Sequence, residues 1–275
     1  MNKAKSLSSA GRHTILIIFA VMFLVPFVGI VVAALHPSNT PVAGFSWPER
    51  WSWGNFAEAW QQGDFNHLML SSAIITVCVV PLAAVLATLA GYGLATLRPI
   101  AAPAIATAFV LGMTLPIELV VVALYFELEP LGLTNNYLGA ILAETGLFMP
   151  FGVFWMHTHF RNLPPEIAES GRVDGGRDFV ILFRLLLPIS WPAITTLCVL
   201  FFIWSWNQFL LLLILMTSPE KRTAPIGLGY FVGEFSTNIP LLSAATCIVA
   251  APSVVMYLIF QRRFVAGITQ GALKG

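Results

Sequence analysis

The sequence predicts an all-α integral membrane protein with six transmembrane helices. Of its 275 residues, 57% are hydrophobic and 10% are charged, whereas a soluble domain carries about 25% charged residues. Uncharged runs recur along the chain, and they reach the roughly 20 residues that an α-helix needs to cross a bilayer. Arg and Lys gather in the segments that would lie on one side of the membrane. The six spans are expected near 14–35, 67–97, 104–128, 137–159, 192–216 and 240–261.

Each run in turn has features that favour a membrane span. The first follows a basic N-terminus, but it exceeds the ~7–15 apolar residues of a signal peptide and is expected to stay in the protein. The second, fifth and sixth runs contain no charged residue. Glu118 interrupts the third run and Glu144 lies within the fourth. Acids inside a membrane span face the protein interior or water by default.

Basic residues predict the orientation, because they concentrate in the cytoplasmic loops of membrane proteins. An even number of spans places both termini on one side. With the termini inside, 11 of the 14 basic residues are cytoplasmic and 3 are external. The cytoplasmic set is Lys3, Lys5, Arg12, Arg98, Arg161, Arg172, Arg177, Arg184, Arg262, Arg263 and Lys274; the external set is Arg50, Lys221 and Arg222. We therefore expect cytoplasmic termini.

This topology divides the chain into an N-terminal segment, a six-helix transmembrane domain and a C-terminal tail, at 1–13, 14–262 and 263–275. Two external loops are expected at 36–66 and 217–239. The first holds four tryptophans, Trp47, Trp51, Trp53 and Trp60. They suit either an interfacial aromatic belt or a docking surface for an external partner. The Gly- and Pro-rich second loop suits a short re-entrant or surface helix.

Several classes of function find no support in the sequence. The formal net charge of +1 does not favour nucleic acid as a partner. The three cysteines, Cys78, Cys198 and Cys247, lie far apart in apolar runs and are expected to be small buried side chains. His157 and His159 point to different faces of a helix, so we expect no metal site. No catalytic residue is expected.

The most informative polar segment is the loop at 161–188, between the fourth and fifth spans. It holds four arginines and four acids in a chain that is otherwise almost free of charge. Pro164 and Pro165 suit the start of a helix, and the helix dipole favours Glu166 and Glu169 in its first turns. We expect a short helix that lies parallel to the membrane.

The sequence Asp174-Gly175-Gly176 indicates a tight turn that ends this helix. A second helix is expected to begin with Phe179–Leu187 and to enter the membrane. Two interpretations remain open at this point. The loop is either an ordinary amphipathic interfacial segment or a docking site, in which the small Ser170 and Gly171 let another surface approach the backbone closely.

The loop resembles the EAA loop of permease subunits of bacterial ABC importers. The pattern of that family is Glu-Ala-Ala, three residues, Gly, nine residues, and then Ile-x-Leu-Pro. Glu169-Ser170-Gly171, Gly175 and Leu185–Pro188 stand at these positions with the same spacing. The departures are Ser and Gly for the two alanines and Leu for Ile, so small residues are kept.

Further matches resemble the carbohydrate-importer permeases that are similar to the G subunit of the maltose permease. They are Val173-Asp174-Gly175, Trp206-Asn207 and the tail Gly267–Gly275. The resemblance covers nearly the whole chain. It implies a multi-pass protein of the bacterial inner membrane that pairs with a second permease subunit to form the path. An ABC ATPase dimer would lie beneath, and an extracytoplasmic solute-binding protein would deliver a sugar.

The resemblance also implies roles for particular residues. The loop would be the coupling helix that docks on the ATPase, and the tail would contact the ATPases. The implied coupling residues are Glu166, Glu169, Ser170, Gly171, Arg172, Asp174, Gly175 and Pro188, and those of the tail are Gly267, Thr269, Gly271 and Lys274. The chain has no G-x-x-x-x-G-K-[ST] phosphate-binding loop of its own. We expect no cofactor on this chain, with ATP and Mg bound by the partner ATPase.

A sugar pathway needs hydrogen-bonding groups and aromatic faces, because a wall of leucines would leave the hydroxyl groups unpaired. The candidates for this lining are Glu118, Glu144, Trp204, Trp206, Asn207 and Gln208. Two alternatives stay open from the sequence. One is a channel or secondary transporter without an ATPase, although no clear internal repeat favours it. The other is a permease for a different solute, such as a glycerol phosphate ester.

Overall fold

The computed structural model describes all residues except 1, 39, 43, 234–236 and 273–275, and it leaves the side chains of 2–10 and 262–272 undescribed. Its contacts divide the chain into two units, 1–66 with 227–251 and 67–226 with 252–275. Within the described residues every named element is a helix, and one isolated β-bridge joins Val232 to Thr237. The fold is therefore all-α, as the composition predicted.

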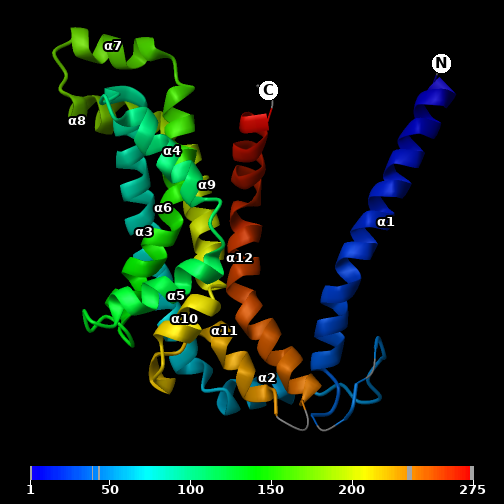
Figure 1. The fold of residues 1–275 in the computed structure, drawn as a ribbon. Helices are drawn as coiled ribbons and strands as arrows, with labels where there is room; N and C mark the ends of the chain where they lie inside the picture. Colours follow the sequence, from blue (N-terminus) through cyan, green and yellow to red (C-terminus); the bar gives the residue numbers. More distant parts are fainter. Residues whose placement is uncertain (1, 39, 43, 234–236, 273–275) are drawn as a thin grey trace. The chain divides into compact units, whose positions relative to one another are not determined.

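The first unit contains α1, α2 and the first part of α12 (Figure 1), together with the short helix η4. Their bounds are Asn2–Ala34, Gly54–Gln62, Leu228–Phe231 and, for the whole of α12, Ile239–Ala272. Asn55 on α2 donates hydrogen bonds from its amide to the carbonyls of Ala34 (2.7 Å) and His36 (2.6 Å). These bonds pair carbonyls that the end of α1 leaves without a helical partner, and they fix the loop that follows α1.

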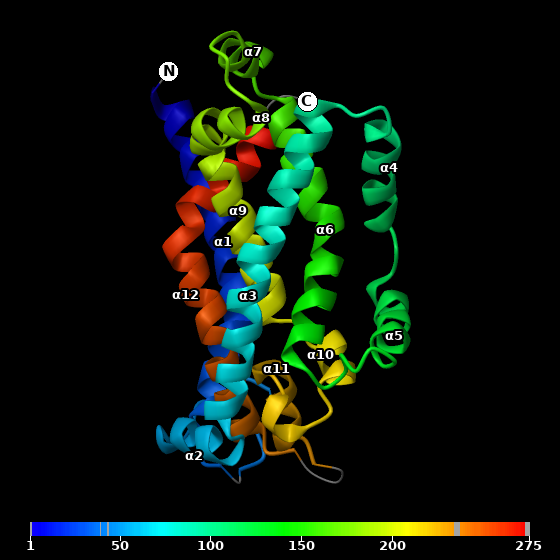
Figure 2. The same cartoon turned by 90° about the vertical axis from the view of Figure 1, so that its left-hand side faces the viewer.

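The second unit carries the other membrane helices and the charged loop (Figure 2). Its helices are α3 (Phe65–Tyr92), η1 (Gly93–Leu97), α4 (Ala102–Gly112), α5 (Ile117–Leu128), α6 (Tyr137–Arg161), α7 (Pro165–Val173), α8 (Asp178–Val180), η2 (Ile181–Leu186), α9 (Leu187–Trp206), α10 (Leu210–Leu215), η3 (Pro219–Lys221) and α11 (Ala224–Gly227). The segments η1 and η2 are π-helical turns that continue α3 and precede α9.

Five helices in the described residues are long and apolar enough to cross a membrane, and a bent pair makes a sixth if it counts as one span. The expectation of six spans is confirmed in this form. The third span, however, is broken, because α4 and α5 meet at an angle of 105°. Pro116 immediately precedes α5 in an extended conformation (φ −61°, ψ 126°). A proline lacks the N–H that would continue the helix, and it disfavours helical geometry in the residue before it.

The fifth span also differs from the expected 192–216. One helical segment runs from Asp178 to Trp206, and the chain then breaks before the separate helix α10. Asn207 ends the long segment, and its side-chain amide donates a 2.7 Å hydrogen bond to the carbonyl of Ile203. Asparagine side chains compete in this way with the helical backbone, and hydropathy does not register the effect.

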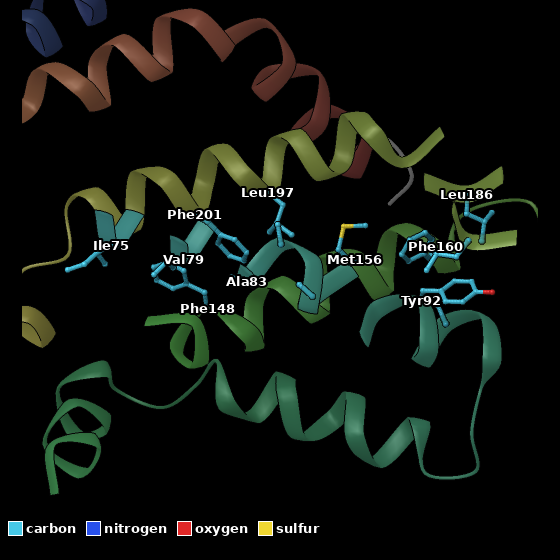
Figure 3. Packing of buried hydrophobic residues seen from close by; sticks show 14 of the residues in the cluster. Ile75, Val79, Ala83, Tyr92, Phe148, Met156, Phe160, Leu186, Leu197 and Phe201 are labelled. Carbon is cyan, nitrogen blue, oxygen red and sulfur yellow. The ribbon is translucent and has the colours of Figure 1, made fainter. Parts of the chain in front are cut away.

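The core of the second unit lies where α3, α6 and α9 run side by side (Figure 2). Phe148 of α6 stacks on Phe201 of α9, with ring centroids 5.2 Å apart. Fully buried alanines of α3, including Ala83 and Ala87, allow the helix backbones to approach closely. Figure 3 shows Ala83, Phe148 and Phe201 among the buried side chains of this core. The three helices therefore form the packed frame that carries the charged loop at one end.

Candidate functional site

The loop at 161–188 folds as the sequence predicts, into a short helix, a turn and a second helix. Helix α7 runs across the direction of α3 and α6 (Figure 1). It begins at Pro165, where a proline costs no hydrogen bond. After the turn, α8 and η2 lead directly into α9. The π-helical turn of η2 ends just before Pro188, whose ring excludes a regular helical hydrogen bond.

The turn after α7 is a Schellman motif. The N–H of Gly176 donates to the carbonyl of Gly171 (2.9 Å), and the N–H of Gly175 donates to that of Arg172 (3.0 Å). Gly175 has a φ of +79°, in the left-handed region that a residue with a side chain rarely adopts. This geometry explains why the sequence has a glycine after Asp174.

Gly171 lies against the chain's own second helix. A Cβ atom added there would stand 2.7 Å from Leu185 Cδ1 and 3.1 Å from Ile181 Cγ1. The residue is buried between α7 and η2. Glycine at this position thus accommodates a contact within the chain, rather than the approach of another surface that the docking interpretation places there. Ser170 is exposed, and its hydroxyl donates to the carbonyl of Ile167 (3.1 Å).

The exposed surface of the loop combines charges with apolar side chains. Glu166, Glu169 and Arg172 are all exposed. Sequence reasoning missed three apolar residues beside them: Val173, Phe179 and Phe183 are 87%, 72% and 56% exposed. The two phenylalanine rings stack with their centroids 6.3 Å apart. Their spacing of four residues was the available signal, since such residues meet on one helix face.

Two contacts at Asp178 tie the loop to the helix frame. The guanidinium of Arg172 lies 3.8 Å from the Asp178 carboxylate. The hydroxyl of Tyr92, at the end of α3, donates to the backbone carbonyl of Asp178 (3.1 Å). The ion pair is about half exposed, so it contributes little stability by itself. Together the contacts set the position of α7 relative to α3 and α9.

A cavity of about 870 Å³ lies at the bend between α4 and α5, where these helices face α6 and the end of α9. Its lining is mostly apolar, and its polar side chains include Asn207 and Gln208, beside Trp204. Trp204 meets Phe151 edge to face, with ring centroids 4.9 Å apart. Asn207 also donates a 3.0 Å hydrogen bond to Ser253 Oγ. A cavity that combines aromatic faces with amide groups can bind a small polar solute.

The structure brings three of the six pathway candidates to this cavity and places the other three elsewhere. Glu118 is exposed on α5 and is absent from the lining. Trp206 is buried and stacks on Phe202, with ring centroids 5.8 Å apart. Glu144 is fully buried, and one of its carboxylate oxygens accepts a 2.6 Å hydrogen bond from Ser205.

The candidates of the tail are described by their backbone alone or lie outside the described residues. Helix α12 continues to Ala272, so Gly267, Thr269 and Gly271 lie on a helical backbone, while Lys274 is outside the described residues.

His159 shares a 2.9 Å hydrogen bond with Ser190. In the part of the chain that the structure describes, no group of three or more His, Cys, Asp or Glu residues could hold a metal ion.

The family described as binding-protein-dependent transport system inner membrane component matches residues 85–270. The chain belongs to this family. The match covers the loop at 161–188, the cavity and most of the helix frame. The chain is therefore a multi-pass permease subunit of the inner membrane that works in a binding-protein-dependent ABC transport system.

Curated relatives match the permease along most of its length. It is 28% identical to the diacetylchitobiose uptake system permease protein NgcG of Streptomyces coelicolor, over 97% of this chain and 89% of NgcG. It is 27% identical to the melibiose/raffinose/stachyose import permease protein MelC of Bacillus subtilis, over 94% of each chain. It is 29% identical to the trehalose transport system permease protein SugB of Mycobacterium tuberculosis, over 92% of this chain and 93% of SugB.

A solved structure has the same fold as this permease. It is the crystal structure of a bacterial ABC transporter involved in the import of the acidic polysaccharide alginate, and its TM-score is 0.80. The alignment covers 95% of this chain and 98% of that chain at 19% sequence identity. At this identity the comparison supports the fold alone.

Proposed function

We propose that this permease imports a sugar or sugar derivative. The observation that carries the proposal is the cavity beside the α4–α5 bend, where Trp204 lies next to the amides of Asn207 and Gln208. Aromatic faces and amide groups are what a sugar needs along an otherwise apolar path. The relatives NgcG, MelC and SugB carry sugars in their names, and this agrees with the proposed substrate class.

The proposed assembly contains this chain, a second permease subunit, an ABC ATPase dimer and an extracytoplasmic solute-binding protein. The two permeases form the path together, and ATP with Mg is bound and hydrolysed on the ATPase chains. Both termini and the loop at 161–188 lie in the cytoplasm, as the excess of basic residues there favours. The C-terminal tail contacts the ATPases through Gly267, Thr269, Gly271 and Lys274.

The loop at 161–188 is the proposed contact with the ATPase. Glu166, Glu169, Ser170, Arg172 and Gly175 are exposed on or beside α7 and are available to a cytoplasmic partner. Val173, Phe179 and Phe183 add exposed apolar surface to the same loop. Burial of such side chains is a main source of binding energy at protein interfaces. Gly171, Asp174 and Pro188 shape the loop.

The helical segment that follows α7 would carry a movement of the loop to the cavity. Helix α7 packs on η2 through Gly171, and η2 continues into α9 within one helical segment, Asp178–Trp206. That segment of 29 residues is about 40 Å long at 1.5 Å per residue. Its far end presents Trp204 to the cavity. A displacement of α7 by the ATPase would therefore move the cavity wall, as alternating access requires.

Purification of the tagged permease from its native membrane tests the proposal. An ABC ATPase and a second permease should copurify, and radiolabelled oligosaccharides should drive ATP hydrolysis once the binding protein is added. A set of amino acids and glycerol phosphate esters is the matched control for substrate class. Stimulation by one of these controls alone would exclude the sugar proposal. If the second permease copurified but no ATPase did, the proposed coupling of this permease to an ATPase would be excluded.

A further inference from the structure

We infer that the permease binds one anionic phospholipid in a groove between α4 and α6. The groove consists of two adjoining cavities of about 340 and 660 Å³, which share Leu94, Ala106, Thr107, His157 and Arg161 in their linings. Figure 2 shows α4 alongside α6 in this region. The groove is separate from the cavity beside the α4–α5 bend, because the lining of the groove and the lining of that cavity have no residue in common.

One end of the groove is basic. Arg161 is the last residue of α6, and Arg98 follows the π-helical turn at the end of α3. Among the described residues, the Arg161 guanidinium makes no ion pair within 4.0 Å. Arg98 uses its Nε in a 3.0 Å hydrogen bond to the carbonyl of Ala95. His157 lines the groove beside them, so cationic and hydrogen-bonding groups converge on one place.

The backbone holds Arg98 in an uncommon conformation. Its φ of 48° and ψ of 57° lie in the left-handed region, which few residues other than glycine adopt. Such conformations cost energy in a residue other than glycine, and here Arg98 caps the end of η1, where its N–H donates to the carbonyl of Gly93 (3.1 Å). Ile100, two residues later, is fully exposed and also lines the groove. An arginine next to an exposed isoleucine suits the boundary between lipid headgroups and acyl chains.

Away from the arginines the groove becomes apolar. Its walls there are Phe109 and Val110 of α4 and Val153 and Phe154 of α6. Val153 precedes Arg161 by eight residues, a distance of about 12 Å along the helix. The groove therefore matches a phospholipid, whose phosphate would lie at the basic end and whose acyl chain would lie between the apolar walls.

The charges favour an anionic phospholipid over a zwitterionic one. Basic pockets between transmembrane helices on the cytoplasmic side bind anionic lipid headgroups. An adjoining cavity of 290 Å³ includes one acid, Glu169, together with Arg98, Arg161 and Arg172. Arg172 of this cavity pairs with Asp178, so Arg98 and Arg161 against one acid leave a positive surplus at the groove.

The test is native mass spectrometry of the purified full-length chain in detergent, titrated with dioleoylphosphatidylglycerol or dioleoylphosphatidylcholine. One phosphatidylglycerol should bind at least tenfold more tightly than phosphatidylcholine. The double variant Arg98→Asn, Arg161→Gln should lose this preference, because each basic residue near a membrane surface contributes about 1 kcal/mol to the attraction of anionic lipid. Asparagine tolerates the backbone conformation at position 98.

Two further variants distinguish the groove from general surface charge. The double variant Arg177→Gln, Arg184→Gln removes two exposed arginines of the loop at 161–188. These residues line neither cavity of the groove, so this variant should keep the preference for phosphatidylglycerol. Val110→Trp fills the apolar part without a change of charge and should weaken binding of both lipids. If the two double variants lost the preference for phosphatidylglycerol equally, the proposed site would be wrong. Unchanged lipid binding in Val110→Trp would also contradict it.

A photoreactive phosphatidylglycerol with a diazirine in its acyl chain locates the site in native membranes, with the transport complex intact. Crosslinks should map to peptides of α4 and α6 that contain Phe109, Val110, Val153 or Phe154. Crosslinking confined to other helices would overturn the proposal. The lipid test does not depend on the identity of the imported solute.

Discussion

Ser205 of α9 donates a 2.6 Å hydrogen bond to the carboxylate of Glu144 on α6, and its hydroxyl lies 3.2 Å from that of Thr76 on α3. The three polar side chains are buried and link the three helices of the packed frame. The second carboxylate oxygen of Glu144 has no partner among the described residues. A buried network of this kind fixes the relative positions of helices, because each group loses its water on folding.

Replacement of Glu144 should therefore affect stability more than transport. Glu144→Ala removes the acceptor of the Ser205 hydroxyl and should cost about 1–3 kcal/mol. Glu144→Gln retains an acceptor and should melt within a few degrees of the wild type in detergent. Uptake by the glutamine variant should be close to normal, since Glu144 does not line the cavity. Normal melting of Glu144→Gln together with abolished uptake would restore its predicted pathway role.

Gln208 is the sharper probe of the proposed sugar path. It lines the cavity, whereas the amide of the neighbouring Asn207 is held by Ile203 and Ser253. Gln208→Leu removes a hydrogen-bonding group of the kind that contributes about 0.5–1.5 kcal/mol, and uptake at low substrate concentration should fall about twofold to tenfold. Radiolabelled uptake measures this. Glu118→Gln, which changes an exposed residue outside the cavity, is the matched control and should transport normally.

The orientation can be tested by cysteine labelling. In a chain whose Cys78, Cys198 and Cys247 are replaced by alanine, Ser170→Cys should resist a membrane-impermeant maleimide in intact cells. Trp53→Cys, on the opposite side of the predicted membrane, should react. Both positions are exposed, so accessibility within the chain does not limit either reaction. Strong labelling at position 170 before cell lysis would reverse the topology.

The sequence predicted the charged loop better than the membrane helices beside it. The spacing from Pro164 to Gly175 specifies a helix start and a left-handed end, and both features depend on local chemistry. The helix break at Pro116 and the helix end at Asn207 also depend on local chemistry. Both lie within long apolar runs, so the hydropathy pattern alone predicted continuous spans there. The burial of Glu144 and the internal contact of Gly171 depend on where other helices pack. Composition and spacing carry no such information.

Truncation tests the proposed role of the tail. Deletion of Gln270–Gly275 should leave membrane insertion intact and lower uptake, because the tail is proposed to contact the ATPases. The alternative is a frayed terminus without function, as many chain ends are. Blue native electrophoresis and uptake should be measured together. Full uptake with normal assembly would favour the frayed terminus.

The last prediction concerns Gly175 and the proposed ATPase contact. Its φ of +79° makes a β-branched residue unfavourable, whereas asparagine tolerates this region. Apart from Gly175 and its two chain neighbours, no atom of the described residues lies within 4 Å of the position that a Cβ would take, so strain in the turn, rather than a clash inside the chain, is the expected cause of any effect. Gly175→Val should cost about 1–3 kcal/mol in the turn and displace α7.

We expect Gly175→Val to abolish uptake and substrate-stimulated ATP hydrolysis, while the helices insert normally. Gly175→Asn should retain much of both activities, which separates backbone strain from loss of glycine itself. Glu169→Lys reverses an exposed charge on α7 without any change of the turn, and it should weaken copurification of the ATPase. Pull-down and uptake should be measured on all three variants. Wild-type ATPase association and uptake in both Gly175→Val and Glu169→Lys would show that this loop does not couple the permease to its ATPase.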